Sequence, residues 1–214
     1  KIEIEDDVKK FLDSSSFKDD TWSIRETEMQ SILDKRTKEM GLGRARAIVV
    51  TRDGRMWHGI SGDMRAFDQP SLIGSLTKTF TSTLIMQLVD EGLISLEDQV
   101  GDMGMGFKHG QITIRELLTH TSGLSKYKTK SGYVAKGTTP IDVLRYVSEQ
   151  PLRSPPGSYV DYSTSGFSLL GLILEQKTGK TFEELLRSRI TDALGYNIST
   201  FRGDYGSIGF STGG

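Results

Sequence analysis

The sequence contains no cysteine, and only five prolines and three histidines occur among its 214 residues. The absence of cysteine excludes disulfide frameworks, thiolate metal sites and cysteine nucleophiles. No apolar run approaches the ~20 residues that a membrane-spanning helix needs. The 27 basic and 28 acidic residues give a formal net charge of −1. This balance disfavours a nucleic-acid partner, because nucleic-acid-binding proteins carry a basic face or stripe.

Hydrophobic patterning predicts a small sheet followed by a long helical stretch. Residues 45–51 and 56–61 are strand-like and flank Asp53-Gly54, which is a hairpin signal. A helix is expected from about 23 to 40, and another begins near residue 75. Further helices are expected at 114–118, 140–148, 166–176 and 182–193. This order favours an α/β (α+β) fold, in which a sheet layer carries an inserted helical lobe.

The segment SLTK at 75–78 carries the clearest chemical signal. Residues three apart share a helical face, so the Lys78 amine can reach the Ser75 hydroxyl. A serine is a poor nucleophile until a neighbouring base takes its proton. Two other Ser-x-x-Lys patterns occur, at Ser15–Lys18 and Ser125–Lys128. On these four residues alone, the favoured interpretation is therefore that Ser75 is a helix N-cap and Lys78 a solvated side chain.

Further segments reverse that interpretation. They are LLTHTSGL at 117–124, YST at 162–164 after PPG at 155–157, and GFSLLG at 166–171. In order after SLTKTF at 75–80, these segments resemble the serine β-lactamase and penicillin-binding-protein superfamily. The nearest branch contains class C β-lactamases, D-alanyl-D-alanine carboxypeptidases and esterases. The resemblance implies a β-lactamase/transpeptidase-like fold, an antiparallel sheet flanked by helices plus a helical lobe.

The resemblance also implies a role for each matching residue. Ser75 would be the acyl-accepting nucleophile and Lys78 its basic partner. Tyr162 matches the tyrosine of the family's Y-x-N motif and would share proton transfer with Lys78, both in acylation and in deacylation. A phenol needs a nearby positive charge to act as a base near neutral pH, and Lys78 can provide it. No cofactor and no metal are expected.

The best match to the family's third motif, of the K-T-G or H-x-G type, is DYGSIGF at 204–210. Gly206 would let a strand lie close against the substrate. The backbone N–H of Ser207, with that of Ser75, would form the oxyanion hole. Two alternatives stay open. The motif is STG at 211–213, or it lies beyond Gly214 and the glycine-rich end is the loop that precedes it.

Two residues depart from the family pattern. Thr164 stands where an asparagine is usual, and Asp204 stands where a lysine or histidine is usual. The second change replaces a carboxylate-binding cation by an anion, which argues against an efficient β-lactamase and is easier to reconcile with an esterase or amidase. His120 lies in the family's structural turn beside the site, so a structural role is favoured over a place in a catalytic triad.

The leading prediction is a serine hydrolase that acts through an acyl-enzyme on an amide, β-lactam or ester carbonyl of a small molecule or peptide. The alternative is a catalytically impaired binding protein with the same fold. The predicted domains are a sheet domain, 1–72 with 198–214, and a helical domain, 73–197, with the active site between them. Self-association is one way to complete the short sheet, and an extracytoplasmic location is favoured because relatives of this type are usually exported.

Overall fold

The computed structural model describes residues 22–63, 71–127, 139–195 and 209–210. By its internal contacts the chain divides into two units, residues 1–69 and 70–214. This boundary lies slightly before the predicted division between residues 72 and 73. The predicted return of 198–214 to the sheet domain stays a prediction, because that segment lies almost wholly outside the described residues.

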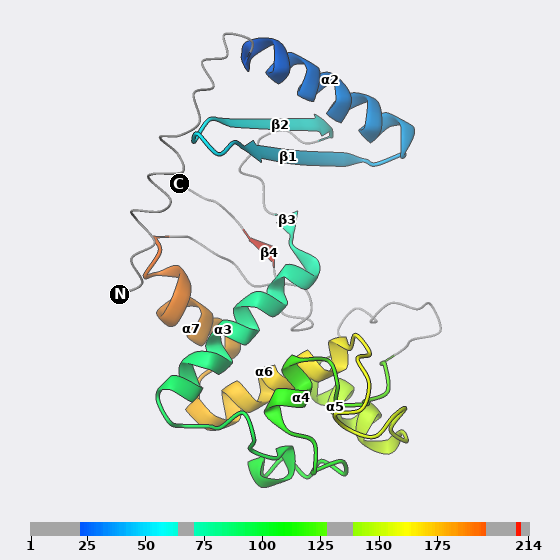
Figure 1. Cartoon of the computed structure of the whole chain (residues 1–214), viewed down its shortest axis with the longest axis vertical. Helices are drawn as coiled ribbons and strands as arrows, with labels where there is room; N and C mark the ends of the chain where they lie inside the picture. Colours follow the sequence, from blue (N-terminus) through cyan, green and yellow to red (C-terminus); the bar gives the residue numbers. More distant parts are fainter. Residues whose placement is uncertain (1–21, 64–70, 128–138, 196–208, 211–214) are drawn as a thin grey trace. The chain divides into compact units, whose positions relative to one another are not determined.

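The first unit is a helix on a β-hairpin. Helix α2 (Trp22–Glu39) packs against strands β1 (Arg44–Val50) and β2 (Met56–Gly62), which pair antiparallel (Figure 1). Val50 pairs with Met56 across the turn, where Gly54 has a φ of +82°. Only glycine adopts such a conformation without steric cost. The hairpin predicted from Asp53-Gly54 is therefore confirmed.

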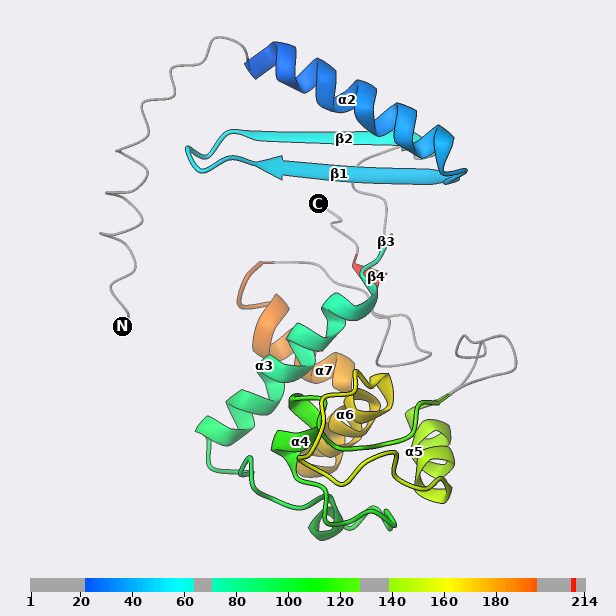
Figure 2. The same cartoon turned by 45° about the vertical axis from the view of Figure 1, so that its right-hand side comes forward.

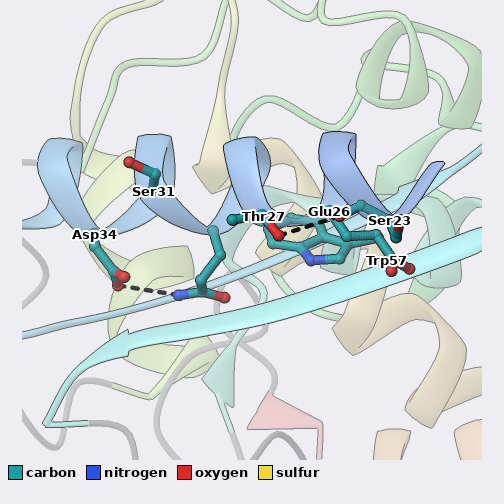
Figure 3. Close-up of a pocket in the computed structure, with 7 residues that line it drawn as sticks. Ser23, Glu26, Thr27, Ser31, Asp34 and Trp57 are labelled. Carbon is teal, nitrogen blue, oxygen red and sulfur yellow. Dashed lines mark hydrogen bonds between the residues drawn. The ribbon is translucent and has the colours of Figure 1, made fainter. Parts of the chain in front are cut away.

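A groove in the first unit runs along α2 beside the buried Trp57 of β2 (Figure 3). Gln30 also lines the groove, and its Nε2 donates to Asp34 Oδ1 within the helix and to the carbonyl of Ile60 in β2, both at 3.0 Å. The second bond attaches the helix to the strand. The groove contains none of the residues that the sequence predicts for the site. Its other lining residues are Ser23, Glu26, Thr27 and Ser31.

The second unit is mainly helical. Helix α6 packs against α3, α4, α5 and α7, and Figure 2 shows these helices gathered around it. The short strands β3 and β4 pair antiparallel, with Ser71 opposite Phe210. No helix in the described part of the chain combines the length and apolarity needed to cross a membrane. The bounds are β3 Ser71–Leu72, α3 Thr77–Asp90, α4 Ile114–Leu118, α5 Pro140–Glu149, α6 Thr164–Thr178, α7 Phe182–Leu186 and β4 Gly209–Phe210.

The core of this unit lies between α3 and α6. Leu84, Ile85 and Leu88 of α3 are fully buried, as the apolar spacing of that helix predicts. Leu170 and Ile173 of α6 are equally buried. Each such side chain stabilises the fold by about 1.5–3 kcal/mol relative to an exposed position. This packing holds the first turns of α3 and α6 in a fixed relation, and both turns carry site residues.

The end of the second unit differs from the sequence prediction. A single helix is expected over 182–193, but α7 ends at Leu186 and continues as a π-helical turn over Arg187–Thr191. The wider turn buries Ile190 and Thr191 while Arg189 reaches Glu91 in a bidentate ion pair, with one N–O distance of 3.1 Å. Hydrophobic periodicity does not reveal an extra residue in one turn, so the sequence could not predict this feature.

Candidate active site

Ser75 lies in a 3-10 turn, Gly74–Leu76, between β3 and α3. The N-cap of α3 is Leu76, which makes no side-chain capping bond. The sequence-based alternative that Ser75 is an N-cap is therefore wrong. The Ser75 residue is exposed, so its hydroxyl is open to a substrate while its backbone is fixed by the turn.

Lys78 lies in the first turn of α3 and is only 7% exposed. Its Nζ donates to Ser75 Oγ at 3.4 Å. The amine also lies 5.0 Å from the ring centroid of Tyr162 and 5.5 Å from that of Phe167, within the range of cation–π attraction. The alternative of a solvated lysine is thus wrong, because two aromatic rings and the serine hydroxyl surround this amine.

Tyr162 contacts the same hydroxyl. Its phenol oxygen lies 2.6 Å from Ser75 Oγ, and the residue is about half exposed. Burial raises the pKa of Tyr162, but the hydrogen bonds with Ser75 and Lys78 and the charge of Lys78 together outweigh it, so the net pKa lies below its ordinary value. A phenol with a lowered pKa is deprotonated in a larger fraction of the molecules near neutral pH, so more of it is ready to accept a proton.

Two neighbours of Tyr162 fix the segment that carries it. The Asp161 carboxylate pairs with Lys126 at 2.6 Å and with Arg153 at 2.7 Å. The Ser163 hydroxyl accepts the Gly166 N–H at 3.2 Å and caps α6. Helix α6 then directs Phe167 toward Lys78. The tyrosine therefore stands between an ion-pair cluster and a capped helix.

His120 contacts the site, as expected for the structural turn that the resemblance places beside it. Its ring centroid lies 4.6 Å from that of Tyr162 and 5.1 Å from that of Phe167. Its Nδ1 accepts the backbone N–H of Ser163 at 3.1 Å. Burial lowers the pKa of His120, and the charge of Lys78 lowers it further. The family resemblance implies that His120 lies beside the site, but no spacing rule links residue 120 to residue 162, so the sequence predicts neither its contact with Tyr162 nor the approach of Phe167.

The other predicted site residues are placed as follows. Thr164 is the first residue of α6, and its carbonyl accepts the Ser168 hydroxyl at 3.3 Å. Asp204, Gly206 and Ser207 lie outside the described residues, so the third motif stays a prediction. In the part of the chain that the structure describes, no group of three His, Asp or Glu side chains could hold a metal ion.

The Tyr162→Phe variant is expected to react with a serine-directed fluorophosphonate about 10²-fold more slowly than the wild type, because it loses the oxygen that can accept the Ser75 proton. The second-order rate of adduct formation measures this effect. Tyr159→Phe is the matched control, since Tyr159 belongs to the same segment and is 66% exposed. Equal rates for the two variants would rule out a proton-transfer role for Tyr162.

Comparisons with known proteins identify the family of this chain. A sequence model of the Beta-lactamase family matches residues 37–205. Penicillin-binding protein 4 of Amycolatopsis lactamdurans is 33% identical over 135 residues, which cover 59% of this chain. They cover only 34% of that protein, so the chain spans about a third of the length of this curated relative.

Two solved structures are similar over most of the chain. A D-stereospecific amidohydrolase from Streptomyces sp. has a TM-score of 0.70 and 28% identity, over 81% of this chain and 55% of that one. A D-amino acid amidase from Ochrobactrum anthropi has a TM-score of 0.68 and 25% identity, over 79% and 54%. The predicted β-lactamase/transpeptidase-like fold is confirmed by these neighbours. With the family match over most of its residues, the chain belongs to the beta-lactamase family.

Proposed function

We propose that this chain carries the nucleophile of a serine hydrolase that forms an acyl-enzyme at Ser75. The observation that carries the proposal is the double contact on one exposed hydroxyl, from Tyr162 at 2.6 Å and from Lys78 at 3.4 Å. Nucleophilic serines need a base within this reach. A structural role explains neither the burial of the Lys78 amine nor its approach to Ser75.

Acylation begins when Ser75 Oγ attacks the substrate carbonyl carbon. The Tyr162 phenolate, stabilised beside the Lys78 ammonium, takes the Oγ proton as the new C–O bond forms. The tetrahedral intermediate then collapses, and the bond to the leaving nitrogen or oxygen breaks. Tyr162 gives its proton to that leaving group, which departs as an amine or alcohol and leaves Ser75 as an ester.

Deacylation repeats the same proton movements with water as the nucleophile. The regenerated Tyr162 phenolate takes a proton from a water molecule, and the hydroxide attacks the Ser75 ester carbonyl. When the C–Oγ bond breaks, Tyr162 returns its proton to Ser75 Oγ. The acid is released, and no other reactant is consumed. The backbone N–H groups of Ser75 and Ser207 are proposed to bind the oxyanion in both steps.

The proposed substrates are amides or esters of D-amino acids, in preference to β-lactams. The structural neighbours named D-stereospecific amidohydrolase and D-amino acid amidase support the amide class. Asp204 supports the preference, because an anion at the usual lysine or histidine position repels a substrate carboxylate. An amide or ester of an amino acid lacks that carboxylate.

The proposal is tested by intact-mass analysis of the protein after incubation with a fluorophosphonate and, separately, a fluorescent penicillin. Hydrolysis is then measured with D- and L-phenylalanine amide, a short-chain nitrophenyl ester and a cephalosporin. We expect a single fluorophosphonate adduct on the peptide that contains Ser75, with turnover of the ester and the D-amide. An adduct without turnover of any substrate would favour the alternative of a catalytically impaired binding protein. A folded protein that forms no adduct with either reagent would overturn the assignment of Ser75.

A further inference from the structure

His120 holds the chain on both sides of Tyr162. Its carbonyl oxygen accepts the Asp161 N–H at 2.8 Å, and its Nδ1 accepts the Ser163 N–H at 3.1 Å. Its ring lies tilted against the Tyr162 ring between these two bonds. One residue of a distant turn therefore fixes three consecutive residues, of which the middle one reaches the nucleophile.

The hydrogen bond from the Ser163 backbone N–H to Nδ1 determines the protonation state of the His120 imidazole. A backbone N–H can only donate, so Nδ1 must present a lone pair and the ring proton must lie on Nε2. The ring is neutral in this arrangement. An imidazolium carries a proton on both nitrogens and could not accept this bond.

The backbone of His120 shows that this placement is imposed by its surroundings. Its φ is +60°, and it is the one non-glycine residue with a positive φ in the described part of the chain. Such backbone conformations are costly for ordinary residues and concentrate at functional sites. Asparagine tolerates this conformation better than most residues, which makes it a suitable replacement.

We propose that His120 is a positioning residue that, as the neutral Nε2–H imidazole, holds Tyr162 against Ser75, and that its protonation releases Tyr162 and slows acylation at acid pH. The proposal deepens the proposed function and rests on it. It assigns to His120 no contact with the reacting atoms. The residue acts through the Tyr162 segment alone.

The charges around the ring set the direction of the pH effect. Lys78 of α3 and the Tyr162 phenol face the imidazole, while the nearby Asp161 carboxylate is neutralised by Lys126 and Arg153. Burial and then the Lys78 charge lower the pKa of His120 from 6.5. The positioning bond is thus present at neutral pH and is lost as pH falls through the folded-state pKa. The free energy of unfolding also falls as the pH drops from the unfolded-state pKa of His120 to its folded-state pKa. In this interval the unfolded chain binds more protons than the folded chain.

The first measurement needs no catalytic activity. Long-range ¹H–¹⁵N correlation NMR of the histidine rings, assigned with the His120→Asn and His109→Asn variants, reports the tautomer and titration of each imidazole. We expect His120 to be the Nε2–H tautomer at pH 7.5 and to titrate below 6.5. A His120 ring protonated on Nδ1, or an imidazolium at pH 7.5, would overturn the proposal whatever the protein catalyses.

The second measurement is the pH profile of fluorophosphonate labelling in two variants. His120→Asn keeps an acceptor for the Ser163 N–H but cannot be protonated, so we expect a rate at neutral pH within about tenfold of the wild type, reduced by the lost ring contacts. Below pH 6.5 its rate should fall less steeply than that of the wild type, because only the protonation of Tyr162 remains to slow labelling. His120→Phe keeps a ring but has no acceptor, and we expect labelling about 10²-fold slower at every pH. His109→Asn is the matched control, because His109 bonds the Gln150 carbonyl away from Ser75.

The outcomes separate the two proposals. A wild type that is never labelled, with His120 as the Nε2–H tautomer, would overturn the proposed function but keep the assigned ring state. A fall in rate at acid pH that is as steep in His120→Asn as in the wild type would overturn the switch. Equal labelling of His120→Phe and His120→Asn would overturn the positioning role. Circular dichroism of each variant identifies a rate loss that comes from unfolding, and the wild-type NMR result then decides the proposal.

Discussion

Replacing Ser75 by alanine is expected to abolish the fluorophosphonate adduct and to lower any hydrolysis by about 10⁴-fold or more, because the attacking oxygen itself is removed. The fold should persist. Ser75 is exposed and does not cap α3, so the free energy of unfolding is expected to fall by about 2 kcal/mol or less, the net value of its two hydrogen bonds with Tyr162 and Lys78. Intact mass and urea unfolding measure the two effects on one sample.

The control for this variant is supplied by the chain itself. Ser125 begins another Ser-x-x-Lys pattern, but its hydroxyl donates to the Pro151 carbonyl at 2.8 Å. Ser125→Ala is therefore expected to label at the wild-type rate. An adduct that survives in folded Ser75→Ala, or one that is lost in Ser125→Ala, would show that the nucleophile is misassigned.

The largest effect on stability is expected from Gly123→Ala. Gly123 has a φ of +69°, and a Cβ there would lie 2.1 Å from the Ser154 carbonyl oxygen, a backbone atom that no side-chain rotation can move. A hydrogen bond of 2.8 Å from the Arg153 N–H to the Gly123 carbonyl also joins these two segments. Urea unfolding should show a loss of about 4 kcal/mol or more, since both the strain and the displacement of the 153–154 backbone contribute.

Gly179→Ala separates these two contributions. Gly179 has nearly the same φ, +68°, but an added Cβ would meet no atom within 4 Å. Its substitution is expected to cost only about 1–2 kcal/mol, the penalty for a left-handed alanine. If both variants lost the same amount, the close approach to Ser154 would contribute nothing.

The sequence predicted the elements that depend on local signals. The hairpin at Asp53-Gly54 and the helix at 114–118 were correct because turn residues and apolar spacing act over a few positions. Ser75, Lys78 and Tyr162 were chosen through the family resemblance, and the structure brings all three together. The spacing of Ser75 and Lys78 alone favours a different interpretation, in which Ser75 caps the helix and Lys78 is solvated.

The contacts that the sequence could not predict join distant residues. Tyr162 meets Ser75 across 87 positions, and His120 meets Ser163 across 43. Such contacts depend on how α3 and α4 pack against α6, which no short pattern encodes. The sequence also does not predict the positive φ of His120, because LLTHTSGL does not reveal which of its residues adopts the left-handed backbone conformation.

The helix starts suggest an order of folding. Among the helices that the structure describes, three begin at a threonine capping box, in which the threonine and a glutamate or aspartate three residues later satisfy each other's backbone N–H groups. These bonds close loops of only a few residues, so they cost little entropy and can form early. The contact of Tyr162 with Ser75 instead joins residues 87 positions apart, and closing so long a loop is slower. During refolding from urea, helical circular dichroism should therefore return before the capacity for covalent labelling, so that labelling reports the last stage of folding.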